Sequence, residues 1–395
     1  MAVLPGLIGS GDFASNDFPE NWRTTLLRLR PDAKAVLTML MGFAKTEELD
    51  APIFHWAEKD IRSMVFTSAA ASSGATTIVF SAPGSTPVKA LRNGQVLKNT
   101  RSGEIIWLNA NPASPWTTLT AVIRGSNCGS TSAAVNSGDK WILMTTRHEE
   151  GATPPQGTYR SPDWLTNYTE IFRNPIDLTR TAAKTALRTA PKGPTDEMLH
   201  DTLEDHMIDI ESSGIWGVPY QGTGANGKPE RTTGGMFHFV TTNAINFADS
   251  FDLADFLEAL RKSLRYGSKK KLLLLGDKGL LTLMSFVLQT SHFSVDANTT
   301  VWGMDVMQIK TPFGRLMVKQ NELLTESDVY SDWGLVIDTK NVRFRPLRDS
   351  DTSLLSDVVK DGRDGTVDEY LCEGGWEWNL EKTHAIWQNF SGFAT

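Results

Sequence analysis

NYTEIFRNPIDLTRTAAKTA, residues 167–186, leads into PTDEMLHDTLEDHMIDIESSGIWG, residues 194–217, and these two runs constrain the architecture most strongly. In the first run, apolar residues recur with an imperfect period of two, which predicts a strand over 167–179. Pro175 favours an edge position in a sheet, because proline donates no hydrogen bond to a neighbouring strand. The two runs together indicate a scaffold rather than an active site.

The second run predicts a long helix with one apolar and one acidic face. Pro194 and Thr195 predict its start, acidic residues in the first turn suit the positive end of the helix dipole, and Gly214 predicts its end. Apolar residues recur at spacings of four, four and three, so Leu203 is expected to face the core. The apolar face consists of Leu199, Leu203, Met207 and Ile210, and the acidic face of Asp201, Glu204, Asp205 and Asp209.

Before these runs, the sequence predicts an arm, a short helix and many short strands. Residues 1–22 are rich in Gly, Pro, Asn and Asp, which suits an extended arm, and apolar residues recur at helical spacing between 32 and 43. Residues 84–147 predict an all-β insertion, with Asn93-Gly94 as its strongest hairpin signal. The predicted strands are 53–56, 61–66, 76–80, 96–97, 104–109, 117–124 and 140–145.

After these runs, predicted helices and strands alternate as in an α+β domain. Apolar faces predict helices over 253–264 and 280–288, on either side of a buried strand at 272–275. The last alternating segment, 368–390, is expected to return to the domain of the long helix. Two strand pairs are expected between the helix at 280–288 and this last segment: 305–310 with 315–320, and 335–338 with 342–345.

Composition places the chain among ordinary folded proteins. Its 395 residues are 40% hydrophobic and 22% charged, and the net charge of -7 disfavours tight binding of nucleic acid. Cys128 and Cys372 lie far apart and have no metal-ligand neighbours, so no disulfide framework is predicted. The N-terminal MAVLPGLIGSGDF lacks the features of a signal peptide, so we expect the chain to stay in a cytoplasm and to keep its N-terminal segment.

The two runs resemble the major capsid proteins of tailed bacteriophages with the Hong Kong ninety-seven fold, and are closest to the siphophage branch of that group. The likeness continues in FADSFDLADFLEALRKSLRYGSKKKLLLLGDKGLLTLMS at 247–285 and in WGMDVMQIKTPFGRLMVKQNELL at 302–324. It covers most of the chain after Asn167 and weakens before Ala51. Several such motifs in the same order are moderately specific, although none of them carries chemistry.

The resemblance implies an α+β capsid subunit with five successive parts. Residues 1–50 would form an N-terminal arm and short helix, and residues 51–177 an extension loop that includes the β insertion 84–147. Residues 178–214 would form the peripheral domain with its spine helix, residues 215–340 the axial domain, and residues 341–395 the returning strands of the peripheral domain.

The function implied by the resemblance is structural, and the chain is not expected to be an enzyme. Hexamers and pentamers of the chain would self-assemble in the host cytoplasm into the icosahedral shell of the virion, which encloses double-stranded DNA. The resemblance also implies portal, scaffold or decoration proteins as partners, and packaged DNA that is bound by weak non-specific contacts. It implies no contact with a membrane. Two alternatives stay open: the shell of a bacterial encapsulin nanocompartment and an unrecognised hydrolase.

Two motifs could carry chemistry, but their sequence context argues against it. Gly222, Gly224 and Gly227 form a GxGxxG pattern, yet no strand leads into it and no helix follows, so a flexible loop is expected. Glu197 and His200 form half of a di-metal motif whose second half is missing. A solvated helix face is therefore expected.

Two further clusters are expected to be structural. Lys269, Lys270 and Lys271 follow a predicted helix and suit its negative C-terminal end better than a phosphate site. Trp376 and Trp378 alternate on one strand face, which favours core packing over a ligand platform. The sequence thus predicts no catalytic, cofactor-binding or metal-binding residue, and no cofactor.

Charge is segregated along the chain. Residues 84–147 contain seven basic and two acidic residues, a net charge of +5, whereas residues 349–381 contain ten acidic and two basic residues, a net charge of -8. The resemblance implies that the extension loop lies over a neighbouring subunit. Part of the basic insertion is therefore expected to dock on an acidic surface of the next subunit, with 349–381 as the candidate. The alternative is that both segments are simply solvated.

Overall fold

The computed structural model describes residues 47–392 apart from 61–62, 155–156, 158, 160, 186–194, 249–251, 291–293, 302–303, 357 and 359–363. The arm predicted at 1–22 and the helix predicted at 32–43 lie outside the described residues. The chain divides into two compact units, Met1–Trp56 with Leu165–Thr395 (unit 1) and Ala57–Trp164 (unit 2). The chain passes between the units through β1 (Ile53–Glu58) and β9 (Asp163–Tyr168), which pair with each other.

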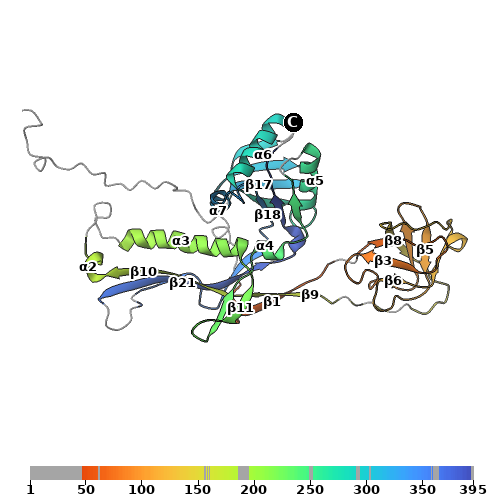
Figure 1. The fold of residues 1–395 in the computed structure, drawn as a ribbon, viewed down its shortest axis with the longest axis horizontal. Coiled ribbons are helices and arrows are strands. Elements are labelled where there is room, and N and C mark those ends of the chain that lie inside the picture. The colour runs from red at the N-terminus through yellow and green to blue at the C-terminus, as the bar shows by residue number, and fades with distance from the viewer. Residues whose placement is uncertain are drawn as a thin grey trace, which may run out of the picture. The chain divides into compact units, whose positions relative to one another are not determined.

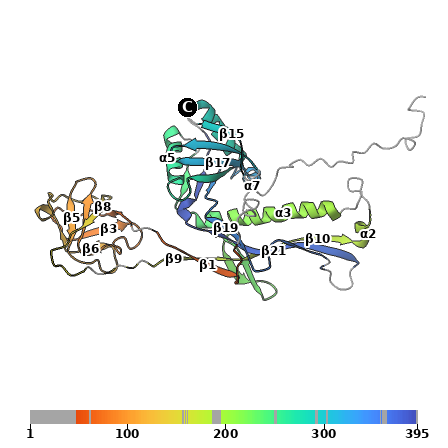
Figure 2. The same ribbon diagram turned by 180° about the vertical axis from the view of Figure 1, so that it is seen from behind.

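Unit 1 contains a long antiparallel ribbon that is covered by a helix. β10 (Glu170–Thr179) pairs along its whole length with β21 (Gly365–Trp378), and α3 (Thr195–Trp216) runs beside both strands (Figures 1 and 2). The predicted strand and long helix are thus confirmed, with a break at Thr169 that separates β9 from β10. β10 is an edge strand, as Pro175 predicts, because β21 is its one neighbour among the described strands. β19 (Val342–Pro346) and β20 (Ser353–Leu355) also pair with β21.

The buried face of α3 differs from the predicted one. Ile210 is buried, but Leu203 is only half-buried, and His206 on the same stripe is fully buried. The prediction that Gly214 ends the helix is wrong, because the helix continues to Trp216. A Cβ atom at Gly214 would lie 2.6 Å from Cε2 of Trp376, so this glycine lets the indole ring pack directly on the helix backbone.

The rest of unit 1 centres on a seven-stranded sheet with the order β13-β22-β18-β14-β17-β16-β15. Alternate leucines of its central strand β14 (Lys270–Leu275) enter different cores: Leu272 and Leu274 join the core shared with α3, whereas Leu273 and Leu275 join the core with α5 and α6. The helices predicted around this strand are confirmed as α5 (Leu253–Ser263) and α6 (Asp277–Thr290). The other strands are β13 (Ala244–Asn246), β15 (Ser294–Val301), β16 (Met304–Thr311), β17 (Gly314–Gln320), β18 (Gly334–Ile337) and β22 (Ala385–Gln388).

Two predicted strand arrangements are wrong. β16 and β17 pair as predicted, but β18 and β19 do not pair with each other, since β18 lies between β14 and β22 while β19 pairs with β21. The C-terminal segment also does not return as a whole to the ribbon, because β22 lies between β13 and β18. The run Ala385–Trp387 is buried throughout, which suits a central strand covered on both faces.

The GxGxxG motif of Gly222, Gly224 and Gly227, where a flexible loop is expected, lies in a β-hairpin. β11 (Tyr220–Thr223) pairs with β12 (Pro229–Thr232), and Gly227 adopts a φ of +73° in the turn between them. The prediction of a flexible loop is therefore wrong. The short helices of unit 1 are α2 (Arg180–Ala183), α4 (Met236–Phe239) and α7 (Glu322–Glu326).

Unit 2 is built on a second seven-stranded sheet, with the order β6-β3-β2-β8-β4-β5-β7. Its core includes Phe66, Phe80 and Trp141. The sheet also contains two strands that precede residue 84, so the compact unit is longer than the predicted insertion 84–147. The strands are β2 (Val65–Ser68), β3 (Ile78–Ala82), β4 (Gln95–Asn99), β5 (Ile105–Leu108), β6 (Thr118–Leu119), β7 (Val122–Ile123) and β8 (Lys140–Thr146). Among the described residues, no helix is both long enough and apolar enough to cross a membrane.

Candidate interaction surfaces

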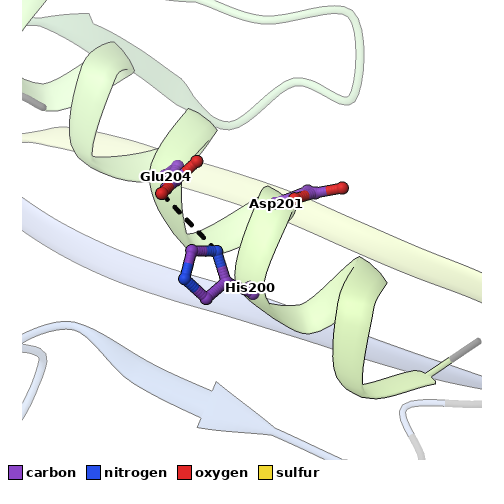
Figure 3. Close-up of side chains that lie close together, drawn as sticks. All are labelled: His200, Asp201 and Glu204. Carbon is purple, nitrogen blue, oxygen red and sulfur yellow. Dashed lines mark ion pairs between the residues drawn. The ribbon is translucent and has the colours of Figure 1, made fainter. Parts of the chain in front are cut away.

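The acidic face of α3 brings His200, Asp201 and Glu204 together, with ligand atoms that all lie within 4.8 Å of one another (Figure 3). The sequence pattern singled out Glu197 as the partner of His200, but His200 Nδ1 lies 3.5 Å from Glu204 Oε1 instead. This i,i+4 pair is exposed and is formed within one helix, as many surface pairs are. Since a single solvated helix supplies all three groups, the geometry gives no reason to assign a metal site.

The lysines at 269–271 were predicted to suit the negative C-terminal end of α5. Lys269 and Lys271 do donate hydrogen bonds to carbonyl groups there. Lys269 Nζ donates to Leu264 O at 2.8 Å, and Lys271 Nζ donates to Ser263 O at 2.6 Å and Tyr266 O at 2.8 Å. Burial lowers the pKa of Lys271 to about 8, because the ammonium group loses water. These contacts satisfy carbonyl groups that a helix end leaves without partners.

A buried histidine, His384, lies near this lysine and directly precedes β22. His384 Nδ1 accepts a hydrogen bond from Asp338 N at 3.2 Å, and Nε2 lies 3.2 Å from Asn379 O, which is consistent with a neutral ring protonated at Nε2. Burial lowers the pKa of His384 to about 4, although the Asp338 carboxylate opposes this shift. The folded chain therefore holds this ring in its neutral form at neutral pH.

Mild acid is expected to destabilise the subunit through His384. Its pKa is about 4 in the folded chain and 6.5 ordinarily, so the unfolded chain binds the proton first and stability falls as the pH drops from 6.5 towards 4. The expected loss is about 2 kcal/mol at pH 5. Urea unfolding of the dissociated subunit between pH 7.5 and pH 5 measures it.

His384→Asn is expected to weaken this pH dependence, because asparagine keeps an acceptor near Asp338 N and does not titrate. His238→Asn, at an exposed position in the same unit, is the matched control, and the pH dependence should change less than in His384→Asn. If His384→Asn kept the full pH dependence, another group would be responsible.

Asn167 links three segments in the interior of unit 1. Its buried Nδ2 donates to Trp376 O at 2.7 Å, Gly234 O at 3.1 Å and Thr233 Oγ1 at 3.1 Å, and its Oδ1 accepts from Gly234 N at 2.7 Å. The end of β9, the loop before α4 and β21 are thereby fixed to one another. The sequence gives no signal for this role, because the partners lie 66 to 209 residues away.

The C-terminal acidic segment is partly neutralised within the subunit, by three ion pairs. Most of its described acids have partners that come from outside 349–381, so the net charge of -8 overstates the free negative charge. The ion pairs are Glu369 with Arg173, Glu377 with Arg345 and Asp364 with Arg180, while Glu373 accepts from Thr169 and Glu381 from Thr241 and Thr242. The exposed acids that remain lie at the start of the segment.

Unit 2 neutralises part of its positive charge in the same way. Arg124 forms a bidentate pair with Glu104 at 2.7 Å and 2.8 Å, and both side chains are buried. Arg101 forms a second bidentate pair with Asp139, and this guanidinium holds the pKa of Asp139 well below its usual range. Arg101 therefore has an internal structural role and is not a free docking charge.

The family model and the curated relative that match this chain are both major capsid proteins. A family model described as SU10 major capsid protein matches residues 8–391. A curated major capsid protein of Pseudomonas phage PaMx41 is 24% identical over 390 residues, which cover 95% of this chain and 87% of that protein. A solved structure from Mycobacterium phage Bobi is 10% identical with a TM-score of 0.46, covering 97% of this chain and 99% of that one. The holo-SrpI encapsulin complex of Synechococcus elongatus is 10% identical with a TM-score of 0.43, covering 59% and 80%.

Proposed function

Since the chain belongs to the family of SU10 major capsid proteins and is a structural subunit of a bacteriophage capsid shell, we propose that it assembles as hexamers and pentamers in a closed icosahedral particle around double-stranded DNA. The observation that best supports this lattice is the exposed edge of β10, where Ile171 is 58% exposed. An extended strand that cannot bury its apolar side chains alone gains from a neighbouring subunit. Of the shell alternatives left open by the sequence, the family supports the phage capsid rather than the nanocompartment.

In this proposal each part of the chain has a role in the lattice. Residues 1–50 are an arm, 51–177 an extension loop and 178–214 the spine of the peripheral domain, with 215–340 as the axial domain. Within 341–395, the strands β19, β20 and β21 return to the ribbon, whereas β22 joins the seven-stranded sheet of the same unit. Assembly takes place in the host cytoplasm, with portal, scaffold or decoration proteins as further partners. The net charge of -7 fits a shell that encloses DNA through weak non-specific contacts.

Electron microscopy of the expressed full chain tests the proposal. Closed particles with both sixfold and fivefold capsomers are expected, either from the chain alone or after co-expression with the scaffold protein of the same phage. A compact monomer in all of these conditions would contradict it. Because many weak contacts act together in a closed shell, particles should persist at subunit concentrations far below those at which an isolated contact would hold.

A further inference from the structure

Unit 2 presents an apolar surface with two lysines on the outer side of its sheet. Val65 on β2 and Lys98 on β4 both lie opposite Ile142 of β8, so the three side chains form one row across the sheet. Met144 and Lys140 lie two residues away from Ile142 on β8 and share its face. The three apolar side chains are 41% to 52% exposed. We call Val65, Lys98, Lys140, Ile142 and Met144 the unit 2 outer face.

The two lysines of this face differ from the arginines nearby. Whereas Arg101 and Arg124 are held by carboxylates of unit 2, neither Lys98 nor Lys140 forms a side-chain ion pair with any described residue. Their charge is therefore available to a partner. The face combines apolar side chains with a positive rim, which fits a partner that is apolar and acidic.

A segment of unit 1 has the complementary chemistry. Leu354 and Leu355 of β20, together with Val358, are 39% to 43% exposed. Asp349 and Asp351 precede them, are exposed, and form no ion pair with the residues that the structure describes. Among the described strands, β20 pairs with β21 alone, which leaves its other edge open there. We call residues 349–356 together with Val358 the β20 segment.

We propose that the unit 2 outer face of one copy binds the β20 segment of a second copy in the shell. Apolar side chains would cover one another while Lys98 and Lys140 approach Asp349 and Asp351. The inference rests on the proposed shell, which supplies the second copy. The sequence predicted a contact between the basic residues 84–147 and the acidic residues 349–381, and the inference restricts it to side chains that form no ion pair within their own subunit. The free energy of each such contact is small, but many copies of the contact in one shell would together stabilise the lattice.

Charge reversal and compensation test the contact. Lys98→Glu with Lys140→Glu is expected to raise the subunit concentration for half-assembly about tenfold, because two attractive pairs become repulsive. Asp349→Asn with Asp351→Lys should weaken assembly in the same direction; asparagine is chosen at 349 because this residue has a φ of +55°. Combining all four substitutions should recover most of the loss. The matched control, Lys59→Glu with Lys89→Glu, changes the charge of unit 2 equally at exposed positions outside the face.

The outcomes separate this inference from the proposed function. If wild type and control fail to form particles, the proposed function fails. If particles form but reversal of the face acts no more strongly than the control, or the four-fold variant is not restored, the contact is overturned. Assembly uses the full chain with any partner that the wild type needs.

Photocrosslinking locates the partner directly. A photoreactive amino acid in place of Ile142, in particles mixed from isotopically light and heavy chains, should crosslink to a peptide containing residues 349–358 of another copy. Crosslinks to the N-terminal residues 1–46, to the same face of another copy or to a different protein would each overturn the proposal.

Discussion

Replacement of Asn167 by alanine is expected to lower the free energy of unfolding by about 3 to 5 kcal/mol. The side chain is fully buried and makes four hydrogen bonds to the loop before α4 and to β21. Alanine would leave Gly234 N, Gly234 O and Trp376 O buried without this partner. Each unsatisfied buried group costs about 1 to 3 kcal/mol, and partial relaxation or entry of water keeps the total below the sum.

Urea unfolding of the dissociated subunit, followed by tryptophan fluorescence, measures this loss. Asn246→Ala is the matched control, because Asn246 is exposed and its side chain accepts bonds from Ala248 N and Asn389 Nδ2. The control should lose about 1 kcal/mol or less. Equal losses in the two variants would show that the Asn167 network does not hold the three segments together.

Local patterns predicted the elements well where each element buries one face. The apolar spacing of α5 is a property of a single helix, so Leu253, Phe256 and Leu260 identified it without knowledge of its neighbours. The strand β10 and the start of α3 at Thr195 follow from similar local signals. Family membership gave the function, because the motifs of the chain carry no chemistry of their own.

Strand pairing was harder, because it depends on distant segments. β18 and β19 are neighbours in sequence, which favoured a hairpin, yet their patterns differ: GLVI of β18 is buried at every position, whereas VRFRP of β19 alternates. A continuous apolar run suits a central strand covered on both faces, and an alternating run suits a sheet with one open face. The two strands therefore belong to different sheets, and the sequence contained this signal.

Charge totals along the sequence were misleading for a related reason. They count Glu369 and Arg101 as free, although Arg173 neutralises the first and Asp139 the second. The partner of Glu369 lies 196 residues away, outside the acidic segment. Pairing at that distance cannot be predicted from composition. Only the structure shows that Arg101 is already paired, and it therefore restricts the proposed docking charges of unit 2 to Lys98 and Lys140.

Gly214→Ala is expected to destabilise the subunit by about 2 to 4 kcal/mol, although alanine in a helix interior normally gains about 1 kcal/mol over glycine. The new Cβ would lie 2.6 Å from Cε2 and 2.9 Å from Nε1 of Trp376. The ring cannot retreat freely, because it is fully buried and its Nε1 donates to Ile210 O at 3.1 Å. Moving it would strain this hydrogen bond and the packing of β21 on α3.

Gly279→Ala in α6 is the matched control, because it tests whether Gly→Ala in a helix stabilises the subunit where no rigid ring blocks the new Cβ. Its Cβ would meet Leu275 Cδ2 at 3.3 Å, a flexible side-chain end, with other atoms no nearer than 3.7 Å. Here the gain in helix propensity should prevail, so the variant is expected to be about as stable as the wild type or up to about 1 kcal/mol more stable. Thermal unfolding of both variants as dissociated subunits compares them. Stabilisation by Gly214→Ala would mean that the helix and the indole ring do not pack as closely as the geometry requires.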